Sequence, residues 1–300
     1  MEAIINSIDY DYINVKQKIF LLFKRYPFLK SSSIGKSCVG REIPLIKIGN
    51  GKDRVLFAAA FHGSERITCN LLLKFIEELC EALVQNSDFC GINVRSAMEN
   101  RELLILPLIN PDGCEISLHG EMGCGYLKEH IRSLCGGNYT KWNANARGVD
   151  INHNFSAGWK ELKEREVALG ILGPASTRFG GYSPESEPET IALCSLCRST
   201  EIRHAVAFHS QGEVIYWSFG DKMPKRSKKM AQIMAASSGY ALDVPSPIAT
   251  GGGFKDWFIK EFERPAFTVE IGLGQNPLPI SDLDSIYERI KEMLILCAIM

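Results

Sequence analysis

Two histidines and two glutamates of this sequence could together bind a metal ion and use it for hydrolysis. His62 and Glu65 are three residues apart and follow an apolar run that ends at Ala60, His209 ends a second apolar run, and Glu270 lies near the end of a third. Imidazole and carboxylate groups suit zinc, and a hydrolytic zinc site needs three protein ligands and one open position for water. The candidate ligands are therefore His62, Glu65 and His209.

Each of these residues also has a simpler interpretation. A histidine and a glutamate three residues apart can be an ordinary surface pair, and a histidine after four apolar strand residues can be a core histidine. The chain has only six histidines, so few others compete for the place of third ligand. Glu270 is flanked by apolar residues, and burial raises the pKa of a carboxyl group toward the range of a general base.

Short apolar runs alternate with stretches of helical spacing along the chain. The runs that read as strands cover residues 43–48, 55–60, 103–109, 204–208 and 266–271, and the helical stretches cover residues 67–83, 188–197, 222–237 and 282–296. This alternation predicts an α/β sandwich of three layers, with helices on both faces of a central sheet. In such sheets, ligand-binding residues gather at the carboxyl ends of the strands, where all four candidates lie.

The composition and net charge of the chain argue against some classes of binding partner. The chain has 300 residues, 45% of them hydrophobic, and a net charge of −1, so no global field attracts nucleic acid or an anionic membrane. No linker or repeat divides it, and we expect a single catalytic domain over residues 1–300. No secretion signal or membrane-spanning run is seen, which predicts a cytoplasmic protein. The ten cysteines are expected to be mostly reduced core residues, Cys194 and Cys197 included.

Five motifs, in order, resemble the M14 family of zinc metallocarboxypeptidases. They are His62 and Glu65 with His209 and Ser210, and the segments 110–113, 147–155, 252–257 and 267–270, within a similarity from about residue 34 to 272. The resemblance implies that family's mixed sheet of about eight strands, one zinc ion per chain on His62, Glu65 and His209, and Glu270 as general base. It also implies that Asp150 orients His62 through the second ring nitrogen and that Asn152 holds substrate.

The substrate-binding positions depart from the family pattern. His153 stands where the family has an arginine for the terminal carboxylate of the substrate, and histidine cannot reproduce the two parallel bonds of a guanidinium. Asn143 stands where the family's oxyanion-stabilising arginine is expected, so Lys141 or Arg147 is a candidate to compensate. Lys255 occupies the position that selects the substrate side chain in the family. It either binds a substrate carboxylate or is a solvated lysine.

The overall pattern is most similar to the bacterial γ-D-glutamyl-meso-diaminopimelate peptidases of this family. The resemblance implies hydrolysis of a small peptide, the stem peptide of a muropeptide, between D-glutamate and the diamino acid. Alternatives are a zinc carboxypeptidase or N-acyl amino acid deacylase of other specificity, or a binding module without catalysis. The last would be marked by loss of a ligand or of the base, and the sequence keeps both.

Overall fold

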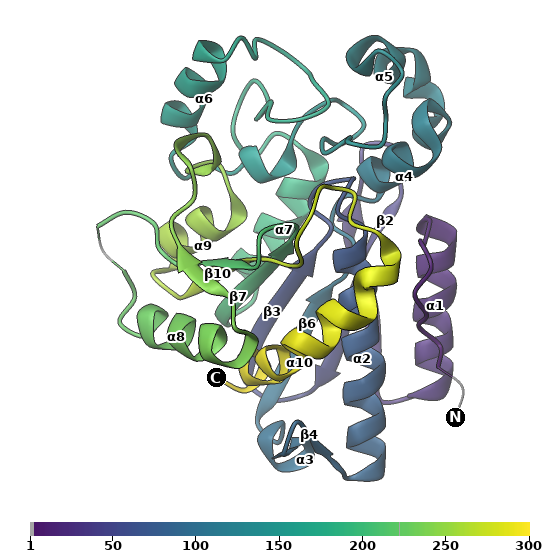
Figure 1. Ribbon diagram of the computed structural model, residues 1–300, viewed down its shortest axis with the longest axis vertical. Coiled ribbons are helices and arrows are strands. Elements are labelled where there is room, and N and C mark those ends of the chain that lie inside the picture. The colour runs from purple at the N-terminus through teal and green to yellow at the C-terminus, as the bar shows by residue number, and fades with distance from the viewer. Residues whose placement is uncertain (1–2, 222) are drawn as a thin grey trace.

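The computed structural model of the protein describes residues 3–221 and 223–300, and eight strands of these ranges form one mixed sheet (Figure 1). These strands are β1 (Lys30–Lys36), β2 (Glu42–Gly49), β3 (Asp53–Ala59), β6 (Arg101–Leu106), β7 (Ile202–His209), β8 (Val214–Tyr216), β9 (Ala241–Asp243) and β10 (Ala266–Glu270). A separate ribbon pairs β4 (Asp88–Phe89) with β5 (Ile92–Asn93). The large sheet has the order β1-β2-β6-β3-β7-β10-β8-β9, and its four central strands β6, β3, β7 and β10 are parallel.

Helices cover both faces of this sheet. They are α1 (Tyr12–Arg25), α2 (Ile67–Gln85), α3 (Val94–Ala97), α4 (Pro111–His119), α5 (Lys128–Cys135), α6 (Trp159–Ala168), α7 (Pro188–Ser199), α8 (Ser227–Ser238), α9 (Phe254–Phe262) and α10 (Leu283–Ile299), with the 3-10 helices η1 (Gly120–Leu127), η2 (Ile151–His153), η3 (Pro247–Ala249) and η4 (Ile280–Asp282). Successive side chains of a strand point to opposite faces. In β3, Val55 and Phe57 join the core closed by α1, α2, α8 and α10, whereas Leu56 and Ala58 join the core closed by α7 and α9.

The arrangement confirms the predicted three-layer α/β sandwich with an eight-stranded mixed sheet. Figure 1 shows α10 crossing in front of the sheet, α4, α5 and α6 gathered at one end of it, and the C-terminus near the other. In the described residues, no helix has both the length and the apolar character that a membrane crossing requires. All ten cysteines are free.

One predicted helix begins later than the sequence suggested. The helical spacing ran from Lys222, which lies outside the described residues, but α8 begins at Ser227. Pro224 explains the difference, because the ring of a proline disfavours helical geometry in the residue before it. The Ser227 N–H then donates to the Pro224 carbonyl oxygen at 2.9 Å as the helix starts.

Candidate active site

The turn that follows β3 places His62 and Glu65 at the carboxyl end of the sheet. Gly63 lies between them, and a Cβ at this position would be 2.2 Å from the carbonyl oxygen of Gly113, so no other residue fits there. The Asn110 side chain donates to the backbone of the turn at 2.9 Å and accepts from the Gly113 N–H at 2.9 Å. The Asn-Pro-Asp-Gly motif thus fixes the turn that carries the first two candidate ligands.

Three polar side chains converge at this point. The Nδ1 atom of His62 lies 2.8 Å from Glu65 Oε1, and Nδ1 of His209 lies 3.0 Å from Glu65 Oε2. The two Nδ1 atoms are 3.3 Å apart. Zinc–nitrogen bonds of 2.0–2.1 Å at a tetrahedral angle separate two ligand nitrogens by about 3.3 Å, so the donor set and its spacing fit a zinc ion. In the described part of the chain, the only other group of this kind is Cys38 with Glu187 and Glu189.

The charges of these groups stabilise one another. Burial disfavours the ionised form of Glu65, but the imidazoles of His62 and His209 outweigh it and lower the Glu65 pKa to about 2. Burial likewise disfavours the charged form of His62, yet the carboxylates of Glu65 and Asp150 raise its pKa well above the ordinary value. The site therefore provides ionised oxygen beside imidazole nitrogen.

Asp150 holds the other side of the His62 ring. Its Oδ1 lies 3.1 Å from His62 Nε2, and its two oxygens also accept from the N–H groups of Asn152 at 3.2 Å and Arg178 at 3.0 Å. Burial opposes the charge of Asp150, but the His62 and His153 rings keep its pKa well below the usual range. A carboxylate in this position fixes the ring so that Nδ1 faces Glu65.

Glu270 lies beside the same three residues. It ends β10 in parallel register with His209 on β7, so both side chains leave the sheet at the same edge. Burial, and after it the negative charge of Glu65, raises the pKa of Glu270 to about 8. A carboxyl group with a pKa near neutrality can both accept and release a proton, as a general base requires.

An open cavity of about 510 Å³ lies over these groups. His62, Glu65 and Glu270 line it, and so does Asn143. The Ser64 hydroxyl donates to Asn143 Oδ1 at 2.6 Å, which leaves the amide nitrogen of Asn143 without a protein partner among the described residues. The cavity that holds a carboxyl base and a potential metal site is thus also lined by a residue with an uncommitted N–H donor.

Comparisons with known proteins agree with this geometry. A family model described as "Zinc carboxypeptidase" (peptidase family M14) matches residues 16–293. The chain belongs to the M14 zinc carboxypeptidase family. It is a metallopeptidase, and the family to which it belongs depends on zinc.

The chain is similar to one of the following proteins in sequence and to the other two in fold. The gamma-D-glutamyl-L-diamino acid endopeptidase 1 of Lysinibacillus sphaericus is 37% identical over 286 residues, which are 94% of this chain and 70% of that protein. Bovine thrombin-activatable fibrinolysis inhibitor, solved with a tick carboxypeptidase inhibitor, superimposes with a TM-score of 0.75 at 18% identity over 97% of each chain. Murein-tripeptide amidase MpaA from Escherichia coli O157 gives a TM-score of 0.53 at 20% identity over 89% of each chain.

Four residues predicted to bind substrate do not line the cavity of this family member. They are Asn152, His153, Lys255 and Arg147. Oδ1 of Asn152 accepts from the Phe254 N–H at 3.0 Å, and the exposed side chain of Arg147 lies 3.6 Å from Glu187. These contacts make Asn152 a tether for the start of α9 and direct Arg147 toward the start of α7.

The remaining two of these residues are buried in polar contacts of their own. His153 Nδ1 lies 3.2 Å from Glu166 Oε1. Lys255 is 5% exposed, donates to the Ser218 carbonyl oxygen at 2.7 Å and pairs with Asp256. Lys255 is therefore not a solvated lysine, because its charge is already neutralised inside the protein.

Several residues that the sequence interpretation missed do line the cavity. They are Ser64, Gln211, Tyr216, Gln275 and Asn276, and Ser210 of the His209 motif lines it too. The Asn276 side chain donates to the Ser210 carbonyl oxygen at 2.6 Å and lies 3.4 Å from Glu65 Oε1. The available signal was position, because residues 210–211 follow β7 directly and residues 275–276 lie in the loop after β10.

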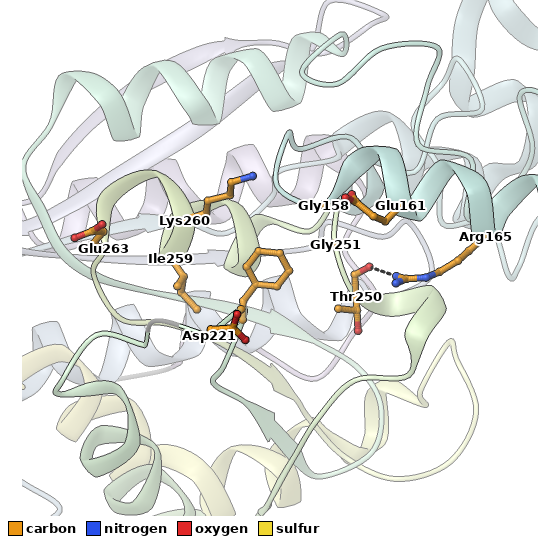
Figure 2. A pocket seen from close by; sticks show the side chains of 11 residues that line it. Gly158, Glu161, Arg165, Asp221, Thr250, Gly251, Ile259, Lys260 and Glu263 are labelled. Atoms are coloured by element: carbon orange, nitrogen blue, oxygen red, sulfur yellow. Dashed lines mark hydrogen bonds between the residues drawn. The ribbon is translucent and has the colours of Figure 1, made fainter.

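A larger cavity of about 570 Å³ lies between α6 and α9 (Figure 2). Figure 2 shows Arg165 and Lys260 on opposite sides of it, and Arg165 donates to the Thr250 carbonyl oxygen at 3.0 Å. Phe219 lines this cavity, and its ring centre is 5.9 Å from Lys255 Nζ. None of the proposed zinc ligands borders the cavity, so its size alone does not make it the reactive site.

Proposed function

We propose that this chain hydrolyses the γ-D-glutamyl-meso-diaminopimelate bond in stem peptides of peptidoglycan, using one zinc ion and Glu270 as general base. The observation that carries the proposal is the convergence of two imidazole nitrogens and a carboxylate beside Glu270, at distances that suit a tetrahedral ion. We take residues 1–300 as one catalytic domain. The ten free cysteines suit a reducing compartment, and action in the cytoplasm is part of the proposal.

The zinc ion would be held by His62, Glu65 and His209. When bound there, zinc supplies Lewis acidity, which polarises a carbonyl group and makes water easier to deprotonate. Asp150 would keep His62 in the tautomer that leaves Nδ1 free to bind. The Asn276 amide, 3.4 Å from Glu65 Oε1, would restrict the position of the carboxylate.

Glu270 would move the protons of the reaction. In its ionised form it takes a proton from the attacking water, and in its protonated form it gives that proton to the nitrogen of the leaving amino acid. Its place at the end of β10, in register with His209, puts the carboxyl group at the edge of the sheet where the ligands meet. A raised pKa favours the second half of this cycle, because the protonated state then persists near neutral pH.

The Asn143 amide would stabilise the negative oxygen that develops on the substrate carbonyl. A neutral amide is a weaker donor than a guanidinium, but an oriented donor in a cavity needs little reorganisation as charge develops. Ser64 supplies that orientation by donating to Asn143 Oδ1 at 2.6 Å, so the N–H side of the amide is left for substrate. Ser64 is thus a positioning residue and Asn143 the group that touches substrate.

Substrate choice is supported by the relative and by the charges of the cavity. The Lysinibacillus sphaericus protein, 37% identical, carries the name of a γ-D-glutamyl-diamino acid endopeptidase. Lys141, exposed at the cavity wall, is the one cationic side chain among the described lining residues apart from the histidine, and it could pair with a free carboxylate of diaminopimelate. His153 and Lys255 would act on substrate only indirectly, through Glu166 and Asp256, unless they exchange these partners.

Product analysis with a defined peptide tests the proposal. We expect zinc-loaded protein to cut L-Ala-γ-D-Glu-meso-diaminopimelate into L-Ala-D-Glu and free diaminopimelate, as read by mass spectrometry. A chelator should stop the reaction and added zinc should restore it. N-acyl amino acids and ordinary C-terminal peptides serve as competing substrates; preference for either would contradict the peptidoglycan assignment, and turnover that survives the chelator would contradict the zinc mechanism.

A further inference from the structure

The amino ends of the central strands surround a second polar cavity, remote from the zinc site. It has a volume of about 490 Å³ and lies where β3 and β7 begin, next to the segment before α8 and the segment after α9. The length of β3, seven residues, places it about 20 Å from the other end of the sheet. Six basic residues line it: Lys52, Arg54, Arg203, Lys225, Arg226 and Arg264.

Acidic partners neutralise only part of this charge. Arg54 pairs with Glu102 at 2.7 Å, and Arg264 pairs with Glu201 at 3.0 Å. The side chains of Lys52 and Lys225 are exposed and make no hydrogen bond or ion pair with another described residue. Glu263 is the remaining carboxylate of the cavity wall apart from Asp53, so cations exceed anions there.

Asp53 is shared by two guanidinium groups, and neither is satisfied by it. Its Oδ2 is 3.5 Å from Arg203 Nη1 and 3.7 Å from Arg101 Nη1, beyond the length of a good charge-assisted hydrogen bond. Of these two arginines Arg203 lines the cavity and Arg101 lies behind Asp53 without lining it. Arg203 Nε and Arg101 Nη1 are shielded from solvent and have no hydrogen-bond partner among the described residues. Shielded donors without a partner are costly, and they are satisfied when an anion supplies the missing acceptors.

The positively charged guanidinium groups around this cavity repel one another. Burial, and after it the charge of Arg203, lowers the pKa of Arg101, and burial and Arg203 lower the pKa of Arg226 as well. Arg226 donates to the main-chain oxygen of Met300 at 2.8 Å, so this guanidinium has an acceptor outside the acidic side chains of the cavity wall. The cavity therefore favours an anion with more than one negative charge.

We propose that this cavity binds the phosphoryl group of a small anionic ligand. The donors come from three directions, namely from Lys52 before β3, from Arg203 on β7, and from Lys225 and Arg226 before α8. A tetrahedral phosphoryl group presents three oxygens to such a set, whereas a planar carboxylate presents two. Guanidinium groups also match phosphate oxygens in pairs. The site is separate from peptide hydrolysis and does not rest on the proposed substrate.

Binding can be measured with inorganic phosphate on the zinc-loaded protein. Ionic strength is held constant with sodium chloride while the melting temperature and the heat of titration are followed. We expect saturable binding and a melting temperature that rises with phosphate, since the ligand binds the folded state. The double variant Arg203→Gln, Arg226→Gln should bind at least about tenfold more weakly, because it removes two charge-assisted contacts.

Matched variants separate this site from other effects. Lys228→Gln removes one positive charge from an exposed position of α8 outside the cavity and should bind phosphate as the native protein does. Lys52→Gln, Lys225→Gln removes two exposed cavity cations that have no partner among the described residues, so it tests the site even where the arginine variant fails to fold. Phosphate at the zinc site would persist in both cavity variants. Binding that is equal in the native protein and in Lys52→Gln, Lys225→Gln overturns the proposal.

The nature of the ligand is tested by comparing anions. Glycerol 3-phosphate carries a phosphoryl group on an organic molecule, and succinate carries two carboxylates without phosphorus. Higher affinity for inorganic phosphate or for glycerol 3-phosphate than for succinate supports the assignment. The one of these two phosphoryl compounds that binds more tightly shows whether free or esterified phosphate is preferred. Equal or tighter binding of succinate overturns the phosphoryl assignment.

Discussion

The two ends of the central strands carry opposite chemistry. At the carboxyl ends, the buried carboxyl groups of Glu65 and Asp150 and the half-buried one of Glu270 gather around imidazoles and an open cavity. At the amino ends of the same strands, the guanidinium groups of Arg101 and Arg203 crowd one aspartate. The buried apolar residues of β3 and β7 separate the two ends by about 20 Å. At this distance the carboxyl groups of one end and the guanidinium groups of the other interact only weakly.

The two ends also differ in how well their polar groups are satisfied. Around His62 and Glu65, nearly every oxygen and nitrogen has a partner within the site, and His209 Nε2 is the exception among these ligands. At the amino ends, donors of two arginines are shielded and have no hydrogen-bond partner in the described ranges of the chain. A satisfied set of groups suits a rigid catalytic centre, whereas unmet donors of one sign suit capture of a diffusible anion. Substitutions should therefore affect turnover at one end, and stability or anion binding at the other.

The largest effect is expected from Glu270→Gln. The change keeps the shape of the side chain but removes its ability to accept a proton, so kcat should fall by about 1,000-fold. Zinc content, measured by atomic absorption, should be unchanged because Glu270 is not a predicted ligand. A fall in kcat of less than tenfold, with zinc still bound, would show that Glu270 is not the general base.

The next largest effect is expected from Asn143→Ala. Loss of an oxyanion donor should lower kcat by about 100-fold with little change in KM, because the contact is made chiefly in the transition state. Ser64→Ala should lower kcat less, since the amide keeps its donor but loses its orientation, and Ser64→Thr should restore much of the loss. If Asn143→Ala raises KM and leaves kcat intact, the residue binds the ground state and the oxyanion assignment is wrong.

A smaller effect on catalysis should follow Asp150→Asn. The substitution removes the charge beside His62 Nε2, and we expect zinc to bind about 10 to 100-fold more weakly, measured by competition with a chelating dye. Glu77→Gln is the matched control, a buried carboxyl group on α2 that accepts from the Ile4 and Ile5 N–H groups and belongs to neither candidate metal group. Equal loss of zinc affinity in both variants would mean that the effect is general and not transmitted through His62.

Much of the catalytic end could be predicted from sequence, because its residues follow directly from strands that are apolar on both faces. His62 and His209 stand at the ends of such runs, and their convergence follows from the parallel arrangement of β3 and β7. Edge strand β1 escaped prediction because it is largely polar and exposed, with the sequence Lys-Ser-Ser-Ser at its start. An exposed edge strand lacks the apolar pattern on which such predictions depend.

The substrate-binding residues were harder to predict, because contacts with other side chains determine which residues are available to bind substrate. Lys255 was predicted to select the substrate side chain, but its neighbour Asp256 pairs with it inside the protein. Ser64 has no distinguishing feature in the sequence, and the role proposed for it rests on its hydrogen bond to Asn143, 79 residues away along the chain. The basic cavity draws on residues scattered from 52 to 264, and the sequence as a whole is nearly neutral.

The smallest effect on turnover, and a distinct effect on stability, is expected at His204 near the start of β7. Its Nε2 lies 2.7 Å from the Cys297 carbonyl oxygen, and Nδ1 is buried without a partner among the described residues. Burial, despite the bond to Cys297, lowers the pKa of His204 to about 4 from an ordinary value of 6.5. The ring is therefore neutral in the folded protein at pH values where the unfolded chain would protonate it.

The sign of the pH dependence follows from this difference. Between pH 6.5 and 4 the unfolded chain binds more protons at His204 than the folded protein does, so the free energy of unfolding falls as the pH falls through this window. The loss from this residue should be about 2 kcal/mol at pH 5 relative to pH 8. His204→Gln keeps a donor for the Cys297 carbonyl oxygen but cannot titrate. The free energy of unfolding in urea should therefore depend less on pH in His204→Gln than in the native protein, and kcat at neutral pH should be nearly equal in the two. The same pH dependence in both proteins would show that His204 is not the titrating group. A large loss of kcat would show that the two ends of the sheet are coupled.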